Sequence, residues 1–325
     1  CSQKQSKRIG LARLEGNAKK LEVNGGIGVI FSRLSIEAPI VKDKASFIVA
    51  ARRSYIDVLA KPFLTGNNAN SKFSFYDLTA KVNYKINDKN TVFMSGYFGR
   101  DVFGTGFGFD WGNTTLTTRW NHVFSNKLFL NATAFYSNYD YMLDSDIENK
   151  RPSDAFKWNS NIENLSIKPD FTYYIRPDNT ISFGGQLLTY DFTPGKANAT
   201  SNGEKREFGQ ANKRGIEASM YVGHDLKINS RLTIQYGVRY SHYDYKSLNG
   251  EYYDRIPVAI TTENPSGFVL KINKTDPSTT VASYGNWEPR FALNITGNES
   301  SSLKLSYNRL AQYIHLMSNT AASTP

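Results

Sequence analysis

The chain has 325 residues, of which 40% are hydrophobic and 14% aromatic, and its formal net charge is +10. The 20 Phe, 20 Tyr and 4 Trp residues favour strands over helices, because aromatic side chains fit the surface of a pleated sheet. No run of 18 apolar residues occurs, which excludes a transmembrane helix but not a transmembrane strand, in which only every second residue need be apolar.

Residues 1–20 hold six basic side chains against one acidic one, and so carry half of the net charge. The other charges are evenly mixed and form no basic stripe, so we predict no nucleic-acid partner and a disordered basic N-terminal segment at residues 1–20. Cys1 is the only cysteine, so no disulfide can form within the chain. Cys1-Ser2 resembles the start of a mature lipoprotein, but without a signal sequence in view we expect a fragment.

Apolar and polar residues then alternate along most of the chain. At residues 232–240 every even-numbered residue is apolar or aromatic and every odd-numbered one is small, polar or charged, which is typical of a strand with one apolar face. Many such segments have the ten or so residues that a tilted strand needs to cross a bilayer. About twelve strands are predicted, near residues 27–38, 46–53, 78–86, 91–101, 113–124, 128–142, 159–174, 180–192, 214–228, 232–240, 287–296 and 303–308.

The connections between these strands alternate in length. In an up-and-down meander every second connection emerges at the same end, so the sequence predicts an all-β, antiparallel transmembrane barrel with one rim of tight turns and one of long loops. A β-propeller, the main soluble alternative, needs a repeated blade signature, and none is found. Short turns are predicted at Val41–Lys44, Asn87–Asn90, Ser125–Lys127, Arg176–Asn179, Asn229–Ser230 and Gly297–Ser300, and long connections at 54–75, 102–112, 145–157, 193–213 and 246–286.

Two local signals accompany the long connections. Ser54-Tyr55-Ile56-Asp57 has the form of a helix capping box and Pro62 follows it, which predicts a short helix. Tyrosines cluster where strands lead into long connections, and we interpret them as a membrane-interface girdle. They are Tyr136, Tyr139, Tyr141, Tyr190, Tyr240, Tyr243 and Tyr245.

The polar residues of the strands are predicted to line a solvated interior, among them Arg33, Lys81, Arg119, Gln235 and Arg239. Arg52 and Arg53 form the densest charge near the long-loop rim, and only one of them can point inward because adjacent strand residues face opposite ways. The candidate ligand-facing residues are Arg52, Arg53, Tyr139, Tyr141 and Tyr243.

No pattern typical of catalysis, a cofactor or a metal is found, so we predict a conduit and not an enzyme. The histidines His122, His224, His242 and His315 fall on separate predicted strands. Gly104–Gly108 lacks the helix and the Lys-Ser/Thr of a phosphate-binding loop, and is predicted to be a flexible loop tip. Asp144, Asp146 and Glu148 could hold a divalent cation, but a solvated acidic loop is the interpretation we favour.

Several phrases resemble TonB-dependent outer-membrane receptors, most closely those with an N-terminal carboxypeptidase-regulatory-like domain. Residues 25–34 and 46–57 look like the first barrel hairpin of that family, and residues 287–291 and 307–320 look like later strands. The resemblance covers residues 17–325. It implies a 22-stranded barrel closed by a plug, which imports a scarce nutrient such as an iron chelate, cobalamin, an oligosaccharide or a peptide.

The same resemblance implies a Gram-negative outer-membrane location, with lipid, the TonB complex and a surface lipoprotein as partners. It supplies no catalytic residue. The sequence shows no plug and no TonB-contacting segment, so we expect residues 21–325 to be a partial barrel, about 12 of 22 strands. The alternatives left open are a passive channel that closes at twelve strands and a soluble carbohydrate-binding or hydrolytic β-protein.

Overall fold

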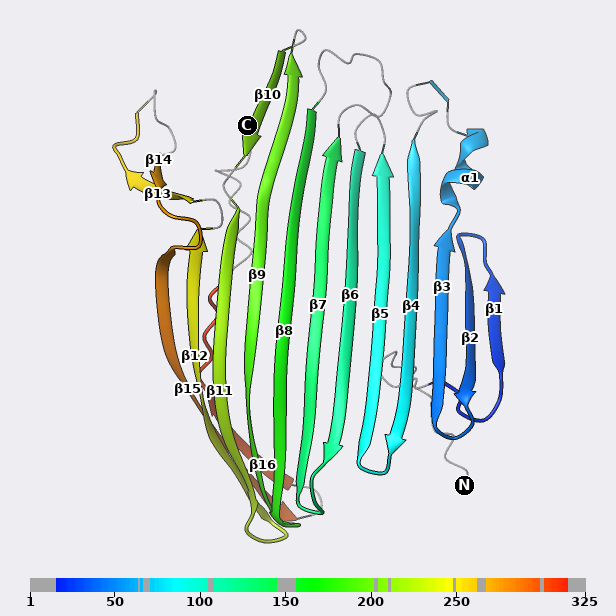
Figure 1. Cartoon of the computed structure of the whole chain (residues 1–325), viewed down its shortest axis with the longest axis vertical. Helices are drawn as coiled ribbons and strands as arrows, with labels where there is room; N and C mark the ends of the chain where they lie inside the picture. Colours follow the sequence, from blue (N-terminus) through cyan, green and yellow to red (C-terminus); the bar gives the residue numbers. More distant parts are fainter. Residues whose placement is uncertain are drawn as a thin grey trace.

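The computed structural model describes residues 16–63, 65–66, 71–104, 108–144, 156–201, 204–209, 212–247, 250–261, 267–298 and 301–314. Its main feature is one antiparallel sheet (Figure 1). The sheet consists of β1 (Glu22–Ile27), β2 (Phe31–Val41), β3 (Ala45–Ser54), β4 (Lys72–Asn87), β5 (Asn90–Gly104), β6 (Gly108–Val123), β7 (Leu128–Asp144), β8 (Phe156–Arg176), β9 (Asn179–Ser201), β10 (Glu204–Gly209), β11 (Lys213–Lys227), β12 (Leu232–Ser247), β15 (Thr280–Asn298) and β16 (Ser301–Asn308).

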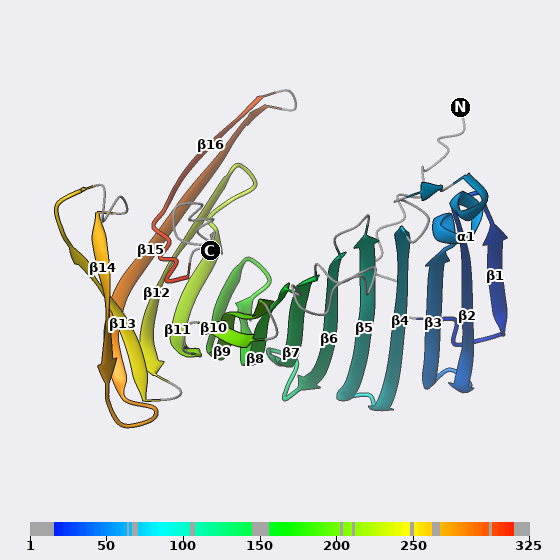
Figure 2. The ribbon, with the colours of Figure 1, turned by 90° about the horizontal axis from the view of Figure 1, so that it is seen from above.

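The strands follow one another in sequence order across this 14-stranded sheet, except that β10 pairs only with the distal end of β9. A separate hairpin of β13 (Glu251–Pro257) and β14 (Phe268–Lys274) lies in the connection between β12 and β15. Seen from above, the sheet curves into an open trough (Figure 2). Among the described residues β1 pairs only with β2, and β16 only with β15, so the sheet does not close on itself.

All twelve predicted strands are present, and the fold class is therefore confirmed. The predicted strand at 27–38 was wrong at its start, because Gly28–Ile30 form a connection that separates β1 from β2. β1 has only six residues and two of them are glycines, so its sequence lacks the sustained alternation of apolar and polar residues that predicts a strand.

Three predicted long connections are largely strand, and the one at 246–286 contains β13, β14 and the start of β15. Within the predicted connection at 102–112, β5 continues to Gly104 and β6 begins at Gly108. The two strands pair there, so that Phe103 lies opposite Phe109. In place of the connection at 193–213, β9 continues to Ser201 and β10 folds back along it. The glycines of 104–108 suggested a loop in the first of these two connections, but strand pairing supplies the backbone hydrogen bonds in both. The predicted loop tip at residues 105–107 lies outside the described residues.

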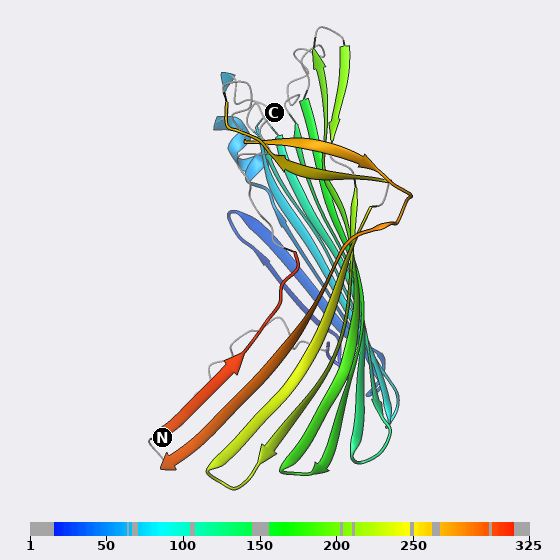
Figure 3. The same cartoon turned by 90° about the vertical axis from the view of Figure 1, so that its left-hand side faces the viewer.

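The predicted tight turns lie together at one end of the sheet, and the longer connections lie at the other (Figures 1 and 3). At the turn after β11, the Asn229 side-chain oxygen accepts hydrogen bonds from the backbone N–H groups of Arg231 at 2.8 Å and Leu232 at 2.9 Å. Asn and Asp close turns in this way because their short side chains reach the following amides. At the turn after β4, a hydrogen bond from Lys85 lowers the pKa of the exposed Asp88 carboxyl.

The helix predicted in the first long connection is present as α1 (Ile56–Ala60), followed by the 3₁₀ turn η2 (Lys61–Phe63). The capping box was wrong, because Tyr55 occupies the N-cap without a side-chain hydrogen bond. The Ser54 hydroxyl instead accepts a hydrogen bond from the Phe75 backbone N–H at 2.8 Å, which joins the end of β3 to β4. Among the described residues no helix is long and apolar enough to cross a membrane.

The two faces of the sheet differ sharply in polarity. Residues directly opposite each other in an antiparallel pair share a face, so the register divides the strands into two sets of rows. One row joins Leu34, Ala51 and Leu78, and the rows on that face are mostly apolar. The neighbouring row joins Arg33, Arg52 and Asp77, and the rows on that face are mostly polar.

The apolar face is largely uncovered. Met220 is 73% exposed and Trp287 62% exposed, whereas the only hydrophobic residues buried in the described part of the chain are Ala45, Leu130 and Tyr243. The sheet is a single layer without a hydrophobic core of its own. An apolar surface of this extent needs an apolar environment, which a bilayer supplies to the outside of a barrel.

Candidate functional site

The polar face is the concave face of the trough, and its rim at the long-loop end holds most of the candidate residues. Tyr313, in the segment after β16 that turns back over the sheet, hydrogen-bonds to Ser241 of a polar row, which fixes the polar side as the inner one (Figure 2). Arg33, Lys81, Arg119, Gln235 and Arg239 all belong to rows of this face.

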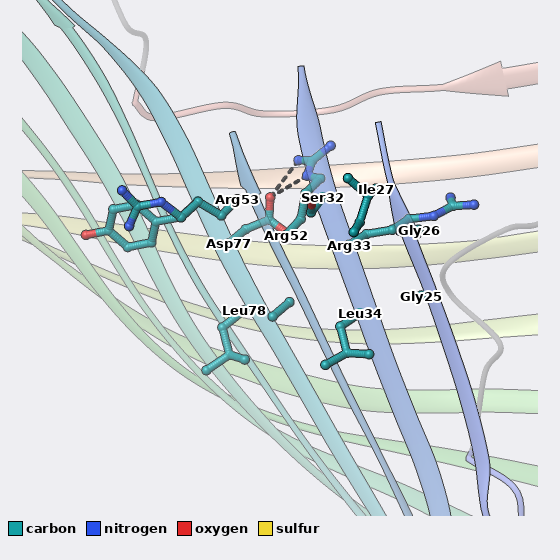
Figure 4. Close-up of a pocket in the computed structure, with 12 residues that line it drawn as sticks. Gly25, Gly26, Ile27, Ser32, Arg33, Leu34, Arg52, Arg53, Asp77 and Leu78 are labelled. Carbon is teal, nitrogen blue, oxygen red and sulfur yellow. Dashed lines mark hydrogen bonds and ion pairs between the residues drawn. The ribbon is translucent and has the colours of Figure 1, made fainter. Parts of the chain in front are cut away.

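Arg52 is held firmly on the concave face. Its Nη2 lies 2.6 Å from Asp77 Oδ2, and its guanidinium lies 5.0 Å from the centre of the Phe75 ring (Figure 4). A cation over an aromatic face and beside a carboxylate is fixed in orientation, so Arg52 offers little free charge to a ligand. Arg53 lies in the next row, between Ser32 and Tyr76, and therefore faces the convex side.

Tyr139 and Tyr141 lie on the concave side of β7. Tyr139 is opposite Asn113 and Tyr141 opposite Trp111, and the Tyr141 ring centre lies 6.2 Å from that of Phe109. Tyr139 is 39% exposed. These rings form an aromatic surface with accessible edges at the long-loop rim, suited to flat or partly apolar ligands.

Tyr243 is on the concave face as well, but another tyrosine covers it. The rings of Tyr243 and Tyr313 are stacked with centres 5.1 Å apart and planes at 7°, and Tyr243 is only 7% exposed. Sequence reasoning placed Tyr313 in a strand-like phrase and missed this contact. The pairing spans 70 residues of chain, so no local pattern could have indicated it.

A charged network lies beside this tyrosine pair. Arg239 donates to Glu217 at 3.0 Å, and the Ser241 hydroxyl donates to Glu288 at 2.5 Å. Glu288 is 5% exposed and Ser241 1% exposed. One buried and one half-buried acid lie beside a single arginine, whose Nη2 is paired with Glu217 while its Nε is buried without a hydrogen-bond partner, so the concave face here is a polar interior and not an apolar core.

The tyrosine clusters are not a girdle, and that interpretation was wrong for most of their members. A girdle must face the lipid, but Tyr139, Tyr141, Tyr190, Tyr243 and Tyr245 all lie in concave rows. Only Tyr136 and Tyr240 face the convex side, where Tyr240 contacts Trp287 with ring centres 4.9 Å apart. Whether a tyrosine faces the lipid or the interior depends on its odd or even position along the strand, and its nearness to a long connection carries no information about that position.

A different aromatic band lies on the convex face near the tight turns. Successive ring centres in it are 4.4 to 6.4 Å apart. Aromatic and imidazole rings at this level suit the boundary between lipid chains and headgroups. The band contains Trp120, His122, Phe124, Phe171 and Phe183, and His224 with Tyr236 continue it on β11 and β12.

Within the described residues no group of His, Cys, Asp or Glu could hold a metal ion. His122, His224 and His242 lie on three different strands, each with hydrogen-bonding neighbours. Asp144 ends β7, whereas Asp146, Glu148 and His315 lie outside the described residues.

A meander of tilted strands with an apolar convex face, a polar concave face and one rim of tight turns is an open portion of a transmembrane β-barrel. No protein-family model and no curated protein matches the sequence. Solved structures do match, among them TonB-dependent outer-membrane receptors and transporters.

Three examples show the extent of the match. The copper transporter OprC has 11% identity and a TM-score of 0.61, covering 91% of this chain and 47% of that one. The hemophore receptor HasR of Serratia marcescens, in complex with its hemophore HasA and heme, has 14% identity and a TM-score of 0.56, covering 89% and 44%. The FrpB iron transporter from Neisseria meningitidis has 10% identity and a TM-score of 0.59, covering 91% and 47%. The chain has the fold of part of such a barrel and spans about half the length of these proteins.

Proposed function

We propose that this chain is part of the barrel of a TonB-dependent receptor that takes up a scarce nutrient across the outer membrane of a Gram-negative bacterium. The observation that carries the proposal is the opposite polarity of the two faces of one continuous meander, with lipid-suited residues outside and a hydrogen-bonded polar surface inside. The similarity to solved receptors over about nine tenths of the chain supports it.

The cargo we propose is an iron chelate, cobalamin, an oligosaccharide or a peptide. It would meet the concave rim at the long-loop end, where Tyr139 and Tyr141 present ring surface and the Arg52–Asp77 pair offers hydrogen-bonding groups with little net charge. Tyr243 would take part only after Tyr313 has moved from its ring. Arg53 faces away from this surface, so of the five candidates it is the one that we do not place against the cargo.

The proposed partners are outer-membrane lipid on the convex face, the TonB complex acting through a plug, and a surface lipoprotein at the long-loop rim. A transporter needs no reaction at its ligand site, so we propose no enzymatic activity. A passive channel closed at twelve strands fits less well, because in the described part of the chain the end strands β1 and β16 do not pair.

The test is growth of a deletion strain on limiting amounts of single nutrients: ferric chelates, cobalamin, oligosaccharides and peptides. We expect a defect on one class of nutrient, of the same size as the defect caused by removing the TonB complex. A further loss of growth when the gene is deleted in a strain that already lacks TonB, or normal growth of the TonB mutant on that nutrient, would support the passive channel instead.

The ligand surface is tested by Tyr139→Ala and Tyr141→Ala in the complemented strain. We expect at least a tenfold loss of binding of the imported nutrient for one of them, because stacking on exposed rings is a large part of such contacts. Tyr136→Ala, on the opposite face of the same strand, is the matched control and should bind normally.

A further inference from the structure

A groove lies on the convex face at the start of the sheet. It has a volume of about 920 Å³ and crosses β1 to β4 (Figure 4). The register places its walls and floor: Leu34 and Leu78 stand on either side of Ala51, with Gly25 beside Leu34. The small side chain of Ala51 leaves a notch between two leucines.

The apolar notch ends at a cation. One row nearer the long-loop rim, Arg53 lies between Ser32 and Tyr76, directly above Ala51 on the same face of β3. Asp77 borders the same stretch of sheet but is bound to Arg52 on the concave side, so its charge is directed away from the groove. The groove therefore presents a positive group at one end and a hydrocarbon-sized notch below it.

The depth expected for these residues in the membrane agrees with a cation at the outer end of the groove and an apolar notch below it. Arg53 is eight residues along β3 from Ala45 at the tight-turn end, which corresponds to about 20 Å across the bilayer for a tilted strand. This is the upper part of the roughly 25 Å apolar band of such barrels, where lipid headgroups of the outer leaflet begin. Long basic side chains at this level reach headgroup phosphates while their stems remain on apolar surface.

We propose that this groove binds one phosphorylated glycolipid of the outer leaflet, with an acyl chain between Leu34 and Leu78 over Ala51 and a phosphate on the Arg53 guanidinium. Of the three arginines that line the groove, Arg52 is paired with Asp77 and Arg33 lies in a concave row, so Arg53 is the cation that faces the convex side, and an anionic lipid fits this arrangement. This inference rests on the proposed outer-membrane placement of the sheet, but not on the cargo.

The experiment is native mass spectrometry of the purified full-length protein in detergent, with three probes: bisphosphorylated lipid A, the same lipid A without phosphates, and phosphatidylglycerol. We expect one tightly retained bisphosphorylated lipid A. Arg53→Gln should weaken its retention about tenfold, because a charge-assisted contact to phosphate is lost. Ala51→Phe should weaken it similarly by filling the notch.

Lys81→Gln is the matched control, because Lys81 is on the neighbouring strand β4 in a concave row and does not line the groove. It should retain lipid A as the wild type does. Equal retention by Arg53→Gln and Lys81→Gln, or equal retention of lipid A with and without phosphates, would overturn the inference. Preferential retention of phosphatidylglycerol would also overturn it, since the proposal commits to the glycolipid.

Fractionation of the same variants separates the two proposals. If the protein is in the outer membrane and lipid A retention does not depend on Arg53, the groove inference fails while the proposed function stands. If the wild-type protein is absent from the outer membrane, the proposed function fails and the groove has no lipid to bind.

Discussion

At the scale of residues, the polar face is organised by a few charged side chains with definite partners. Arg239 lies between Glu217, to which it donates at 3.0 Å, and the row neighbour Glu288, which is 5% exposed. Removing the arginine would leave two poorly hydrated carboxylates close together. The network is therefore expected to be sensitive to the loss of its one cation.

We predict that Arg239→Gln lowers the free energy of unfolding by about 1 to 2 kcal/mol, since the pair is partly hydrated and its full low-dielectric cost does not apply. The measurement is a urea titration of tryptophan fluorescence for protein folded in lipid vesicles. Arg119→Gln, a change of the same kind in another concave row, should shift the free energy by less than about 0.5 kcal/mol. Equal effects of both substitutions would contradict the account.

The residue scale also shows what sequence could predict. The sequence correctly predicted that only one of Arg52 and Arg53 faces inward, because successive side chains along a strand point to opposite faces whatever surrounds them. It could not say that Asp77 and Phe75 would hold Arg52, nor that Tyr313 would cover Tyr243, because both depend on contacts between segments far apart in the chain.

At the scale of elements, the contact between β8 and β9 includes a position where a side chain would not fit. A Cβ at Gly184 would lie 2.3 Å from the Pro169 carbonyl oxygen and 3.0 Å from the Tyr221 ring. The Tyr221 hydroxyl is fixed by Asp170 at 2.6 Å, so the ring cannot move away freely. β8 and β9 approach each other closely here because the glycine leaves room for the backbone and the ring.

We predict that Gly184→Ala lowers the free energy of unfolding by about 1 to 3 kcal/mol, the usual cost of forcing extra atoms into a filled space. Gly96→Ala is the matched control, because its new Cβ would lie 3.6 Å from the nearest atom, the Thr115 carbonyl oxygen. It should be neutral or stabilising, since alanine loses less backbone entropy on folding. The same urea titration compares the two, and a neutral Gly184→Ala would refute the close approach.

Element positions were predictable because alternation and turn chemistry are local. Asn229 closes its turn through its own following amides, and the sequence located that turn correctly. The ends of β5, β6 and β9 were not predictable, because their extra length depends on pairing with the neighbouring strand and not on composition.

At the scale of the whole molecule, the central claim is that one sheet separates lipid from water. The polarity of the faces follows from the sequence pattern, and the direction of curvature, with the polar face inside, follows from the structure (Figures 2 and 3). The sequence indicated about twelve strands and a barrel that does not close, but it missed β1, β10, β13 and β14 and did not indicate the inward return of residues 309–314.

The most direct test is a spin-label scan of residues 232–240 in β12, with Cys1→Ser as the background so that each introduced cysteine is the only thiol. In lipid vesicles, collision with oxygen should peak at Ile234, Tyr236 and Val238, and collision with a water-soluble nickel chelate should peak at the odd-numbered positions between them. Opposite phases of the two reagents with a period of two residues are the predicted result. Peaks of both reagents at the same positions, or no alternation, would contradict a sheet with lipid on one side and water on the other.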